Sequence, residues 1–317
     1  MKSTPALSVV LPVYNQDRYI GAAVQSVLRQ TFQDFELLVV DDGSTDRTPK
    51  ILDAIADPRL RIIKKKHAGF IQALRTGIQE ARAPWVARMD SDDVSSPNRF
   101  ETEMAFLANH PECVFVGSVF GIVTPNDYFL APVERFDWRV LSATDITCAS
   151  VSFADPSTIF CRRTALQSGL YDEAFPRNET PLWYKMLARG NGVVIGEPLH
   201  YVRWRLGSMS RADVLRGWFD NRDIRRLYHP ESNPQRSHRV LPPEQRARVN
   251  AAARCQNYYL LAGDIAAARE VAKSALRQRP LSSEVWKMLL RGQLRRPTLR
   301  RAKSANSIPY RAVAAPW

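Results

Sequence analysis

Residues 1–110 alternate between strand-like and helix-like segments, and this alternation restricts the fold more than any other feature of the sequence. Apolar, β-branched runs of strand length cover residues 7–14, 35–44, 59–66 and 85–90. Apolar residues recur at helical spacing in residues 19–30, 48–56 and 70–82. Such alternation builds βαβ units, whose right-handed crossovers stack the strands as a parallel sheet covered by helices. The sequence therefore predicts an α/β protein with a Rossmann-like, mostly parallel sheet and flanking helices.

The length and the cysteine content predict a globular, cytoplasmic protein. A chain of 317 residues with 45% hydrophobic residues buries one large core or two modest ones. Its cysteines form no C-x-x-C pair, which favours buried free thiols in a reducing compartment; they are Cys113, Cys148, Cys161 and Cys255. The apolar run at 8–14 is too short for a signal peptide, and no segment reaches the roughly 20 apolar residues that span a bilayer.

The formal net charge of +13 is unevenly distributed along the chain. Residues 1–210 carry a net charge of −1, whereas residues 211–317 carry +14. This change marks a boundary between a nearly neutral domain and a basic extension. The extension is suited to an anionic partner such as a membrane surface, a nucleic acid or an acidic glycolipid, and a solvated basic helical face without a partner is an equally good interpretation.

Carboxylates follow two of the predicted strands. Asp41 and Asp42 follow one strand, and Asp90, Asp92 and Asp93 follow another. Ligands of parallel α/β sheets bind beyond the carboxyl ends of the strands, so we expect both clusters to face one cleft. Like charges repel and unpaired carboxylates resist leaving water, so the clustering indicates a cationic ligand.

Two common phosphate-binding motifs are absent from the sequence. The turn after the first strand, PVYNQDRY, lacks the glycines of a G-x-G-x-x-G fingerprint, and no G-x-x-x-x-G-K-[ST] loop occurs. A dinucleotide-dependent dehydrogenase and a P-loop protein are therefore disfavoured. Phosphates bound at this edge would need a cation in place of a glycine-rich cradle. Mg²⁺ or Mn²⁺ prefers oxygen ligands, and Asp90 and Asp92 could share such an ion.

Three motifs, in order, resemble those of family 2 glycosyltransferases of the GT-A fold. They are SVVLPVYNQ, VVDDGSTD and ARMDSDDVSSPNRF, the last followed by a helix and HPECVFVGS. The resemblance extends more weakly to about residue 210 and implies a catalytic domain at 1–210, with a nucleotide-sugar half at 1–110 and an acceptor half at 111–210. It implies transfer of a sugar from a nucleotide-sugar donor with inversion at the anomeric carbon, and a UDP-sugar is the family tendency.

Matched position by position, the motifs imply roles at the donor site. Pro12, Tyr14 and Asn15 resemble the strand edge that contacts the nucleoside. Asp42, with Asp41 beside it, resembles the aspartate that binds the base. Both aspartates have a second explanation, which is compatible with the first: they start an Asx-type turn in DDGSTD.

Asp90 and Asp92 resemble the D-x-D pair of the family. The resemblance makes Asp92 the direct metal ligand and shares Asp90 between the ribose and the metal. Asp93 is better explained as a residue that organises the start of the helix predicted at 97–109 than as a ligand.

The resemblance also implies a catalytic base. In an inverting transfer a carboxylate removes the proton from the acceptor hydroxyl. The family places a Glu-Asp pair before a Leu-Trp, and aligning on that dipeptide puts Asn178 and Glu179 at the pair and Pro181 where an aspartate is common. Glu179 is thus the expected base, and the alternative is a first-turn helix residue stabilised by the helix dipole. Asp172 and Glu173 are the second candidates.

A further departure lies in HYVRWRLGSMS. The family often carries Arg-x-His here, and this chain has Arg203 and Arg205. Arginine does not ligate a cation, but its fork matches phosphate oxygens, so both residues are expected to stabilise the departing diphosphate. Metal affinity would then depend on Asp90 and Asp92.

The extension at 211–317 reads as basic and largely helical. Residues 247–292 resemble one tetratricopeptide-like hairpin, and residues 295–317 lack periodicity and are expected to be flexible. Binding to nucleic acid is disfavoured relative to binding to anionic lipid headgroups. An enzyme that acts on lipid-linked acceptors works at a membrane surface, which would explain the positive charge of the extension. The expected location is the cytoplasm, at the inner face of the membrane.

Two classes of function follow from the sequence. The first is a metal-dependent glycosyltransferase that builds a cell-surface polysaccharide or glycolipid on a glycan or lipid-linked acceptor. The second is a non-catalytic nucleotide-sugar-binding or scaffold protein. Asn178, Pro181 and Arg205 are the departures that suggest the second class.

Overall fold

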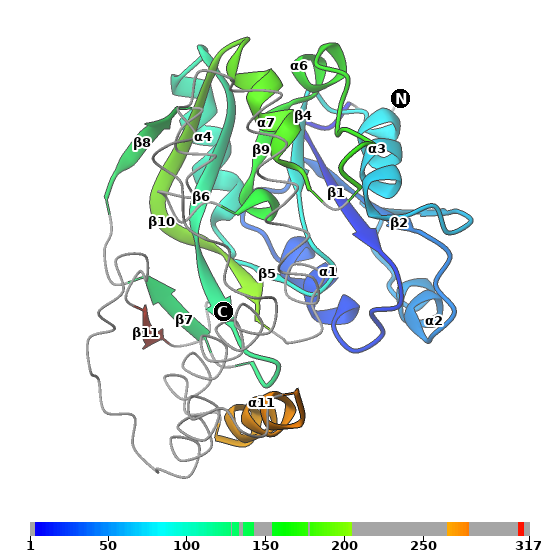
Figure 1. Cartoon of the computed structure of the whole chain (residues 1–317). Helices are drawn as coiled ribbons and strands as arrows, with labels where there is room; N and C mark the ends of the chain where they lie inside the picture. Colours follow the sequence, from blue (N-terminus) through cyan, green and yellow to red (C-terminus); the bar gives the residue numbers. More distant parts are fainter. Residues whose placement is uncertain are drawn as a thin grey trace.

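The computed structural model describes residues 4–127, 129–132, 136–142, 154–176, 178–204, 265–278 and 310–313. In these ranges the strands join one sheet that is covered by helices on both faces (Figure 1). The predicted α/β class is confirmed.

The N-terminal half has the predicted βαβ order. Its strands are β1 (Leu7–Val13), β2 (Phe35–Asp41), β3 (Leu60–Lys64) and β4 (Trp85–Arg88). Its helices are α1 (Ile20–Leu28), α2 (Thr48–Asp53) and α3 (Phe70–Glu80). The four strands are parallel, in the order β3-β2-β1-β4. Because the order reverses beside β1, the ends of β1, β2 and β4 meet at a topological switch point, where open α/β sheets bind ligands.

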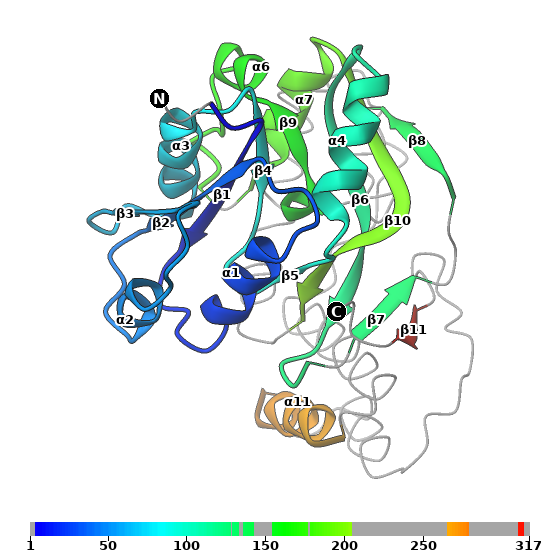
Figure 2. The same cartoon turned by 180° about the vertical axis from the view of Figure 1, so that it is seen from behind.

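Both faces of β1 are buried because helices cover the sheet on both sides (Figures 1 and 2). Val9 and Leu11 belong to the core that contains residues of α1, α2 and α4 (Arg99–Asn109), whereas Val10 belongs to the core that contains residues of α3 and α7 (Thr180–Leu187). A strand buried on both faces has a continuous apolar run, which is the pattern seen at residues 7–13.

The second half continues the same sheet. Its remaining elements are β5 (Val94–Ser95), β6 (Cys113–Val123), β7 (Phe129–Pro132), β8 (Trp138–Leu141), the 3₁₀ turn η1 (Asp155–Ser157), β9 (Ile159–Cys161), α6 (Arg162–Gln167) and β10 (Asn191–Arg203). Strand β9 lies antiparallel between β4 and β6 and so joins the two halves. Strand β10 runs parallel to β6 and antiparallel to β5, which places its end against the turn that follows β4.

A buried ion pair in α4 connects three elements behind the site. Arg99 Nε lies 3.1 Å from Glu103 Oε2, and both side chains are 0% exposed. Arg99 Nη2 also donates to the carbonyl oxygens of Arg88 and Thr158, each at 3.1 Å. Burial raises the pKa of Glu103 to about 7, although Arg99 acts in the opposite direction. The pair therefore ties α4 to β4 and to the residue that precedes β9.

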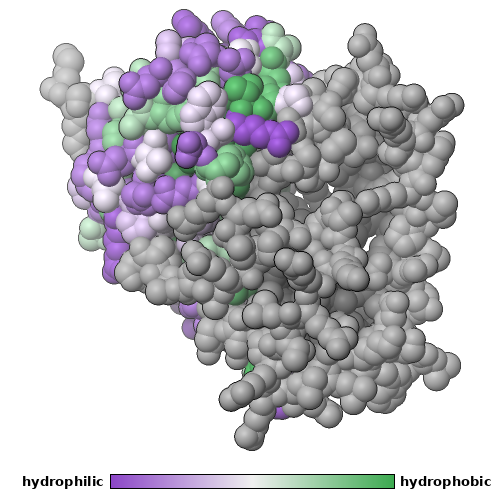
Figure 3. All heavy atoms as spheres, turned by 90° about the vertical axis from the view of Figure 1, so that its left-hand side faces the viewer, coloured by the Kyte–Doolittle hydropathy of each residue, from purple (hydrophilic) through white to green (hydrophobic). Residues whose placement is uncertain are grey.

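Strand β8 carries apolar side chains at the surface. Trp138 and Val140 are 47% and 46% exposed, and the Trp138 ring packs 5.6 Å from the ring of Phe106 on α4. Figure 3 faces the β8 side and shows hydrophobic atoms interspersed with hydrophilic ones on the described part of this face.

Two elements of the basic extension are described. They are α11 (Ile265–Gln278) and β11 (Tyr310–Val313), and β11 pairs antiparallel with β7. The strand lies in the segment 295–317, where the sequence pattern did not indicate one. The other residues of the hairpin predicted at 247–292 lie outside the described residues, and the domain boundary at 210 stays a prediction. None of the described helices is both long enough and apolar enough to cross a bilayer.

Candidate active site

The turns that follow β1 and β2 are joined by Asn15. This residue adopts a φ of 51°, and its side-chain Oδ1 accepts a hydrogen bond from the amide of Thr45 at 2.8 Å. Its own amide donates to Ser44 Oγ at 2.9 Å. Asp41 Oδ1 in turn accepts from the Ser44 amide at 2.9 Å, which is the Asx-type turn that the sequence indicates. Pro12 lies in β1 beyond the last residue paired with β4, so its missing N–H breaks no ladder bond on that side.

The carboxylate of Asp42 holds the loop between β3 and α3. The side chain is buried and accepts from the amides of Ala68 and Gly69 at 2.9 and 2.8 Å. His67 Nδ1 lies 2.8 Å from Asp42 Oδ2, and the His67 ring stacks on Tyr14 with 4.1 Å between ring centroids. Tyr14 is 41% exposed, so an aromatic face borders this edge of the sheet.

Gly43 is required between these two turns. Its φ is +81°, and a Cβ built on it would lie 2.9 Å from the backbone nitrogen of His67. We therefore expect Gly43→Ala to cost about 1 kcal/mol or more, to lower the melting temperature by about 2–4 °C and to weaken nucleotide binding. Gly21→Ala on α1 is the matched control. A Cβ there would meet only Ile51 Cγ2, at an ordinary van der Waals distance of 3.8 Å. Equal melting temperatures for both variants would contradict this account.

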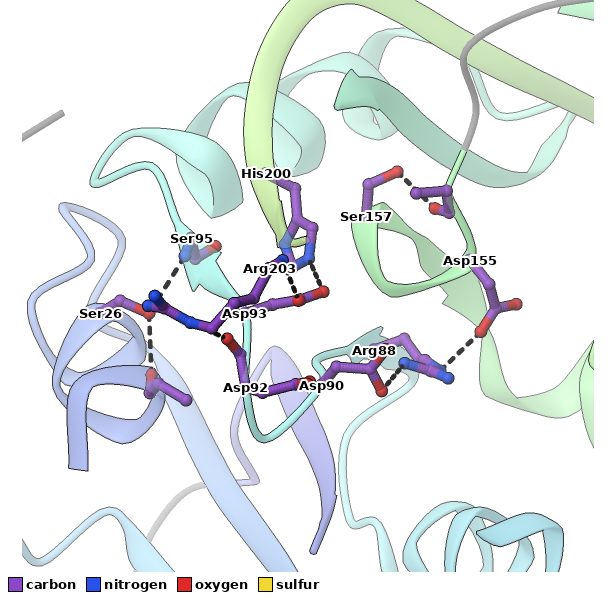
Figure 4. A network of polar contacts seen from close by, with 12 residues as sticks. Ser26, Arg88, Asp90, Asp92, Asp93, Ser95, Asp155, Ser157, His200 and Arg203 are labelled. Carbon is purple, nitrogen blue, oxygen red and sulfur yellow. Dashed lines mark hydrogen bonds and ion pairs between the residues drawn. The ribbon is translucent and has the colours of Figure 1, made fainter. Parts of the chain in front are cut away.

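The D-x-D segment forms the turn after β4 (Figure 4). The carboxylate of Asp90 is 29% exposed and is paired with Arg88. Burial raises the pKa of Asp90 to about 7, Arg88 lowers it, and the neighbouring carboxylates Asp93, Asp92 and Glu179 raise it further. A nearby cation would return Asp90 to its ionised form, so the environment of this group suits a metal ion.

Asp93 has a structural role in the same turn. Its buried carboxylate accepts from the amide of Arg203 and lies 2.8 Å from His200 Nε2. Arg99 Nη1 lies 3.3 Å from the other ring nitrogen of His200. Because arginine only donates, Nδ1 of His200 is the acceptor and Nε2 carries the proton toward Asp93. Burial, Arg99 and Arg88 lower the pKa of His200, which keeps the ring neutral.

Arg203 contacts the protein through its guanidinium. Nε donates to the carbonyl oxygen of Asp92 at 2.7 Å, and Nη1 donates to the Thr124 carbonyl at 2.7 Å and to Asp127 Oδ1 at 2.8 Å. The side chain is 1% exposed and lies 4.7 Å from the centre of the Tyr19 ring. These contacts anchor the D-x-D turn to β10. Arg205 lies outside the described residues.

Arg88 binds three carboxylates at once. The guanidinium nitrogens reach Asp90, Asp155 at 2.6 Å and Glu179 at 2.6 Å, and the Arg88 side chain is 1% exposed. Figure 4 shows Arg88 lying between Asp90 and Asp155. Burial alone would lower the pKa of Arg88, but the three carboxylates raise it well above its ordinary value. One guanidinium thus faces three carboxyl groups, and burial raises the pKa of Asp155 well above its ordinary value although Arg88 lowers it.

Glu179 lies at the start of α7, and its side chain is 20% exposed. The helix is capped by its neighbour instead, because Asn178 Oδ1 accepts from the Thr180 amide at 3.0 Å. Glu179 is therefore free of the capping role and pairs with Arg88. Asp172 and Glu173 are turned to other partners: Asp172 accepts from the Ala174 amide at 3.0 Å, and Glu173 lies 3.2 Å from Arg75.

The structure thus brings together Asp90, Asp92 and Glu179, and it places the turns that carry Tyr14, Asn15, Asp41 and Asp42 at the same sheet edge. Sequence reasoning missed Arg88 and Asp155. Arg88 was signalled by a cationic residue at the end of a strand otherwise read as buried, beside the acidic cluster. No sequence signal pointed to Asp155, whose position depends on the crossing of β9 beside β4.

The residues present fit a divalent cation. In the described part of the chain no group of three or more His, Cys, Asp or Glu side chains is arranged around a common metal position. Asp90 and Asp92 supply the hard oxygen ligands that Mg²⁺ and Mn²⁺ prefer when substrate phosphates complete the coordination.

Comparison with solved structures identifies the fold. The chain is similar to S. aureus TarS 1-349 in complex with UDP-GlcNAc, with a TM-score of 0.55 and 18% identity over 90% of this chain and 88% of the TarS 1-349 chain. It is also similar to the mannosyltransferase PcManGT from Pyrobaculum calidifontis in complex with GDP-Man and Mn²⁺, with a TM-score of 0.52 and 18% identity over 92% of this chain and 85% of that chain. The fold is therefore of the GT-A type.

The sequence comparisons identify the family. The model of glycosyl transferase family 2 matches residues 8–169, about half of the chain. An uncharacterized glycosyltransferase of Haemophilus influenzae is 33% identical over 68% of this chain and 69% of its own length. Glycosyltransferase GlyG of Streptococcus pneumoniae is 28% identical over 67% of this chain and 75% of its own length. The protein belongs to glycosyltransferase family 2, and the predicted family and transferase class are confirmed.

Proposed function

We propose that the protein transfers a sugar from a nucleotide-diphosphate sugar to a hydroxyl of a glycan or lipid-linked acceptor, with inversion, in the synthesis of a cell-surface polysaccharide or glycolipid. The observation that carries this proposal is the pairing of Glu179 with the D-x-D residue Asp90 through one guanidinium. A relative named chondroitin synthase, from Escherichia coli, is 38% identical over 32% of this chain and supports a polysaccharide product.

The donor would bind at the switch point of the sheet. Tyr14 and Asn15 would contact the nucleoside. Pro12 has no N–H to donate to a neighbouring strand, and it would leave the end of β1 open to the nucleoside. Asp42 and Asp41 hold the two turns that border the base, and Asp42 keeps carboxylate lone pairs for it. The structural neighbours with UDP-GlcNAc, UDP and GDP-Man support a nucleotide-sugar donor. We choose a UDP-sugar as the donor.

Mg²⁺ or Mn²⁺ would be held by Asp92, with Asp90 shared between the ion and the ribose. When bound, the ion neutralises the diphosphate and stabilises the negative charge that develops on it as it leaves. The Mn²⁺ complex of the structural neighbour supports this choice. Arg203 would act on the diphosphate indirectly, by fixing the backbone of Asp92, and Arg205 remains a proposed direct contact.

The chemical step assigns one task to Glu179. Its carboxylate accepts the proton of the acceptor hydroxyl while that oxygen forms a bond to the anomeric carbon. The bond from the anomeric carbon to the diphosphate oxygen breaks on the opposite face, and its electron pair leaves with the nucleoside diphosphate. Attack opposite the leaving group inverts the configuration of that carbon. The 20% exposure of the Glu179 side chain leaves it open to such an acceptor.

The basic extension supports a location at an anionic membrane surface on the cytoplasmic side. Residues 211–317 carry a net charge of +14, and each Lys or Arg near such a surface contributes about 1 kcal/mol. A lipid-linked acceptor would be presented there.

We expect nucleotide sugars to stabilise the protein only when a divalent metal ion is present. Ligands that bind only the native state raise the melting temperature, by an amount equivalent to about 2.7 kcal/mol at a hundred times Kd. A thermal-shift screen of UDP- and GDP-sugars with Mn²⁺, Mg²⁺ or EDTA measures this effect. Asp92→Asn should abolish the stabilisation, and Asp53→Asn, an exposed carboxylate on α2, should preserve it.

Donor binding alone does not separate the enzyme from a non-catalytic nucleotide-sugar-binding protein. Release of free nucleoside diphosphate by the wild-type protein supports the enzyme. Metal-dependent binding without turnover on water or on any acceptor would overturn the proposed function in favour of the binding protein.

A further inference from the structure

We propose that Arg88 is a positioning residue that fixes the base Glu179 and the metal-side carboxylate Asp90 on one guanidinium, and that Asp155 holds this guanidinium from beneath. This inference rests on the proposed function, because it assigns Arg88 and Asp155 to the same reaction. It goes beyond that function by naming the groups that set the geometry between base and metal.

The contacts of Arg88 involve three separate segments of the chain. Asp90 belongs to the turn after β4, Asp155 to η1 and Glu179 to the start of α7. A guanidinium is planar and presents its donors in a fixed fork, so Asp90 and Glu179, which accept hydrogen bonds from Nη1 and Nη2, are fixed relative to one another. Asp155 is held at Nε by an ion pair. A lysine ammonium, as a single point of charge, would not fix them in this way.

The backbone and the plane of Arg88 are themselves restrained. The Arg88 amide donates to the Thr158 carbonyl at 2.9 Å, and the Arg88 carbonyl accepts from Arg99 Nη2 at 3.1 Å. The guanidinium carbon lies 5.0 Å from the centre of the Phe70 ring on α3. Arg88 is therefore a rigid support, which a catalytic group needs because a displacement of about 1 Å can cost about 10²-fold in rate.

Burial separates the four residues into an outer and an inner pair. The side chains of Asp90 and Glu179 are 29% and 20% exposed, whereas those of Arg88 and Asp155 are 1% and 12% exposed. The outer carboxylates are thus the pair open to substrates, and the inner pair is more deeply buried. An ion-pair network that served stability alone would not need its two most exposed members to be the base and the metal-side carboxylate.

Asp155→Asn and Arg88→Lys test the inference. Asp155→Asn preserves the shape of the side chain and replaces one carboxylate oxygen by an amide, at a residue outside the proposed donor and acceptor contacts. We expect it to lower kcat for UDP release from UDP-GlcNAc with Mn²⁺ by about tenfold, while KM and the affinity for UDP stay within a factor of about two. Arg88→Lys should lower kcat by about 10²-fold, because charge without the fork does not hold Glu179. Arg59→Lys and Asp57→Asn make the same two changes in an ion pair with 2.9 Å between its atoms, directly before β3, and should leave kcat unchanged.

A double-mutant cycle separates positioning from stability. If Asp155 acts through Glu179, Asp155→Asn should have no further effect on kcat in the Glu179→Gln background, measured with radiolabelled donor. A full tenfold effect in that background, or a kcat of Asp155→Asn equal to the wild type, would overturn the inference and leave the proposed function intact. A wild-type protein that releases no nucleotide from any sugar donor would overturn both.

Discussion

Glu179→Gln is expected to lower kcat for sugar transfer by about 10²- to 10⁴-fold, the range that a general base contributes. Glutamine preserves the size of the side chain and can still accept a hydrogen bond from Arg88, but it cannot take the acceptor proton. Because Glu179 is not among the proposed donor contacts, the affinity for UDP with Mn²⁺ should not change. Nucleotide release and calorimetric titration of UDP measure the two quantities on the same preparation.

Glu173→Gln is the discriminating comparison for the base. Glu173 has a 58% exposed side chain and pairs with Arg75 on the surface, although the sequence made it a second candidate. A loss of activity in Glu173→Gln with an active Glu179→Gln would move the base to Glu173. Loss of UDP affinity in Glu179→Gln would instead show that the substitution disturbs the donor site.

Arg99→Met is expected to cause the largest loss of stability, about 3–5 kcal/mol. The variant leaves the carboxylate of Glu103 buried without its partner and removes the donor from the carbonyls of Arg88 and Thr158. Chemical denaturation monitored by tryptophan fluorescence measures the free energy of unfolding. Lys64→Met, which breaks an ion pair whose side chains are both 57% exposed, should change it little.

The loss in Arg99→Met should depend on pH. The folded pKa of Glu103 is about 7, above its ordinary 4.5, so the folded protein binds a proton that the unfolded chain releases between these values. Stability from this group is present below pH 4.5 and falls as the pH rises to about 7. Without Arg99 the folded pKa rises further, so the deficit of the variant should be larger at pH 8 than at pH 5. A deficit independent of pH would contradict the ionised state of the pair.

The fold of the first half could be predicted because each strand and helix carries its own periodicity. The strand predicted at 85–90 ends at Arg88, and the helix predicted at 48–56 ends at Asp53, so the boundary errors reach two to three residues. The second half was harder to predict, because β9 has three residues and gains its place only by pairing with β4 and β6. Strand β11 joins the sheet from a segment without any periodic pattern, which no local rule indicates.

The part of the candidate site that consists of acidic residues at strand ends could be predicted from the sequence. The supporting residues could not, because their roles depend on contacts between distant segments. Arg203 was read as a phosphate contact, since the sequence shows its charge but not that its donors meet Asp92, Thr124 and Asp127. Asn178 was interpreted as the loss of one carboxylate of the catalytic pair. In the structure its side chain accepts a hydrogen bond from the first turn of α7, so the side chain of Glu179 is not needed there.

The position of β11 has a practical consequence for anyone who shortens this chain. A version that stops before Tyr310 would leave the N–H and C=O groups of β7 uncovered along the side where β11 pairs. An edge strand with unpaired N–H and C=O groups can pair with a strand of another chain, which promotes self-association. Expression work on the catalytic half alone should therefore retain the last residues through a linker, or place a charged or proline substitution along β7.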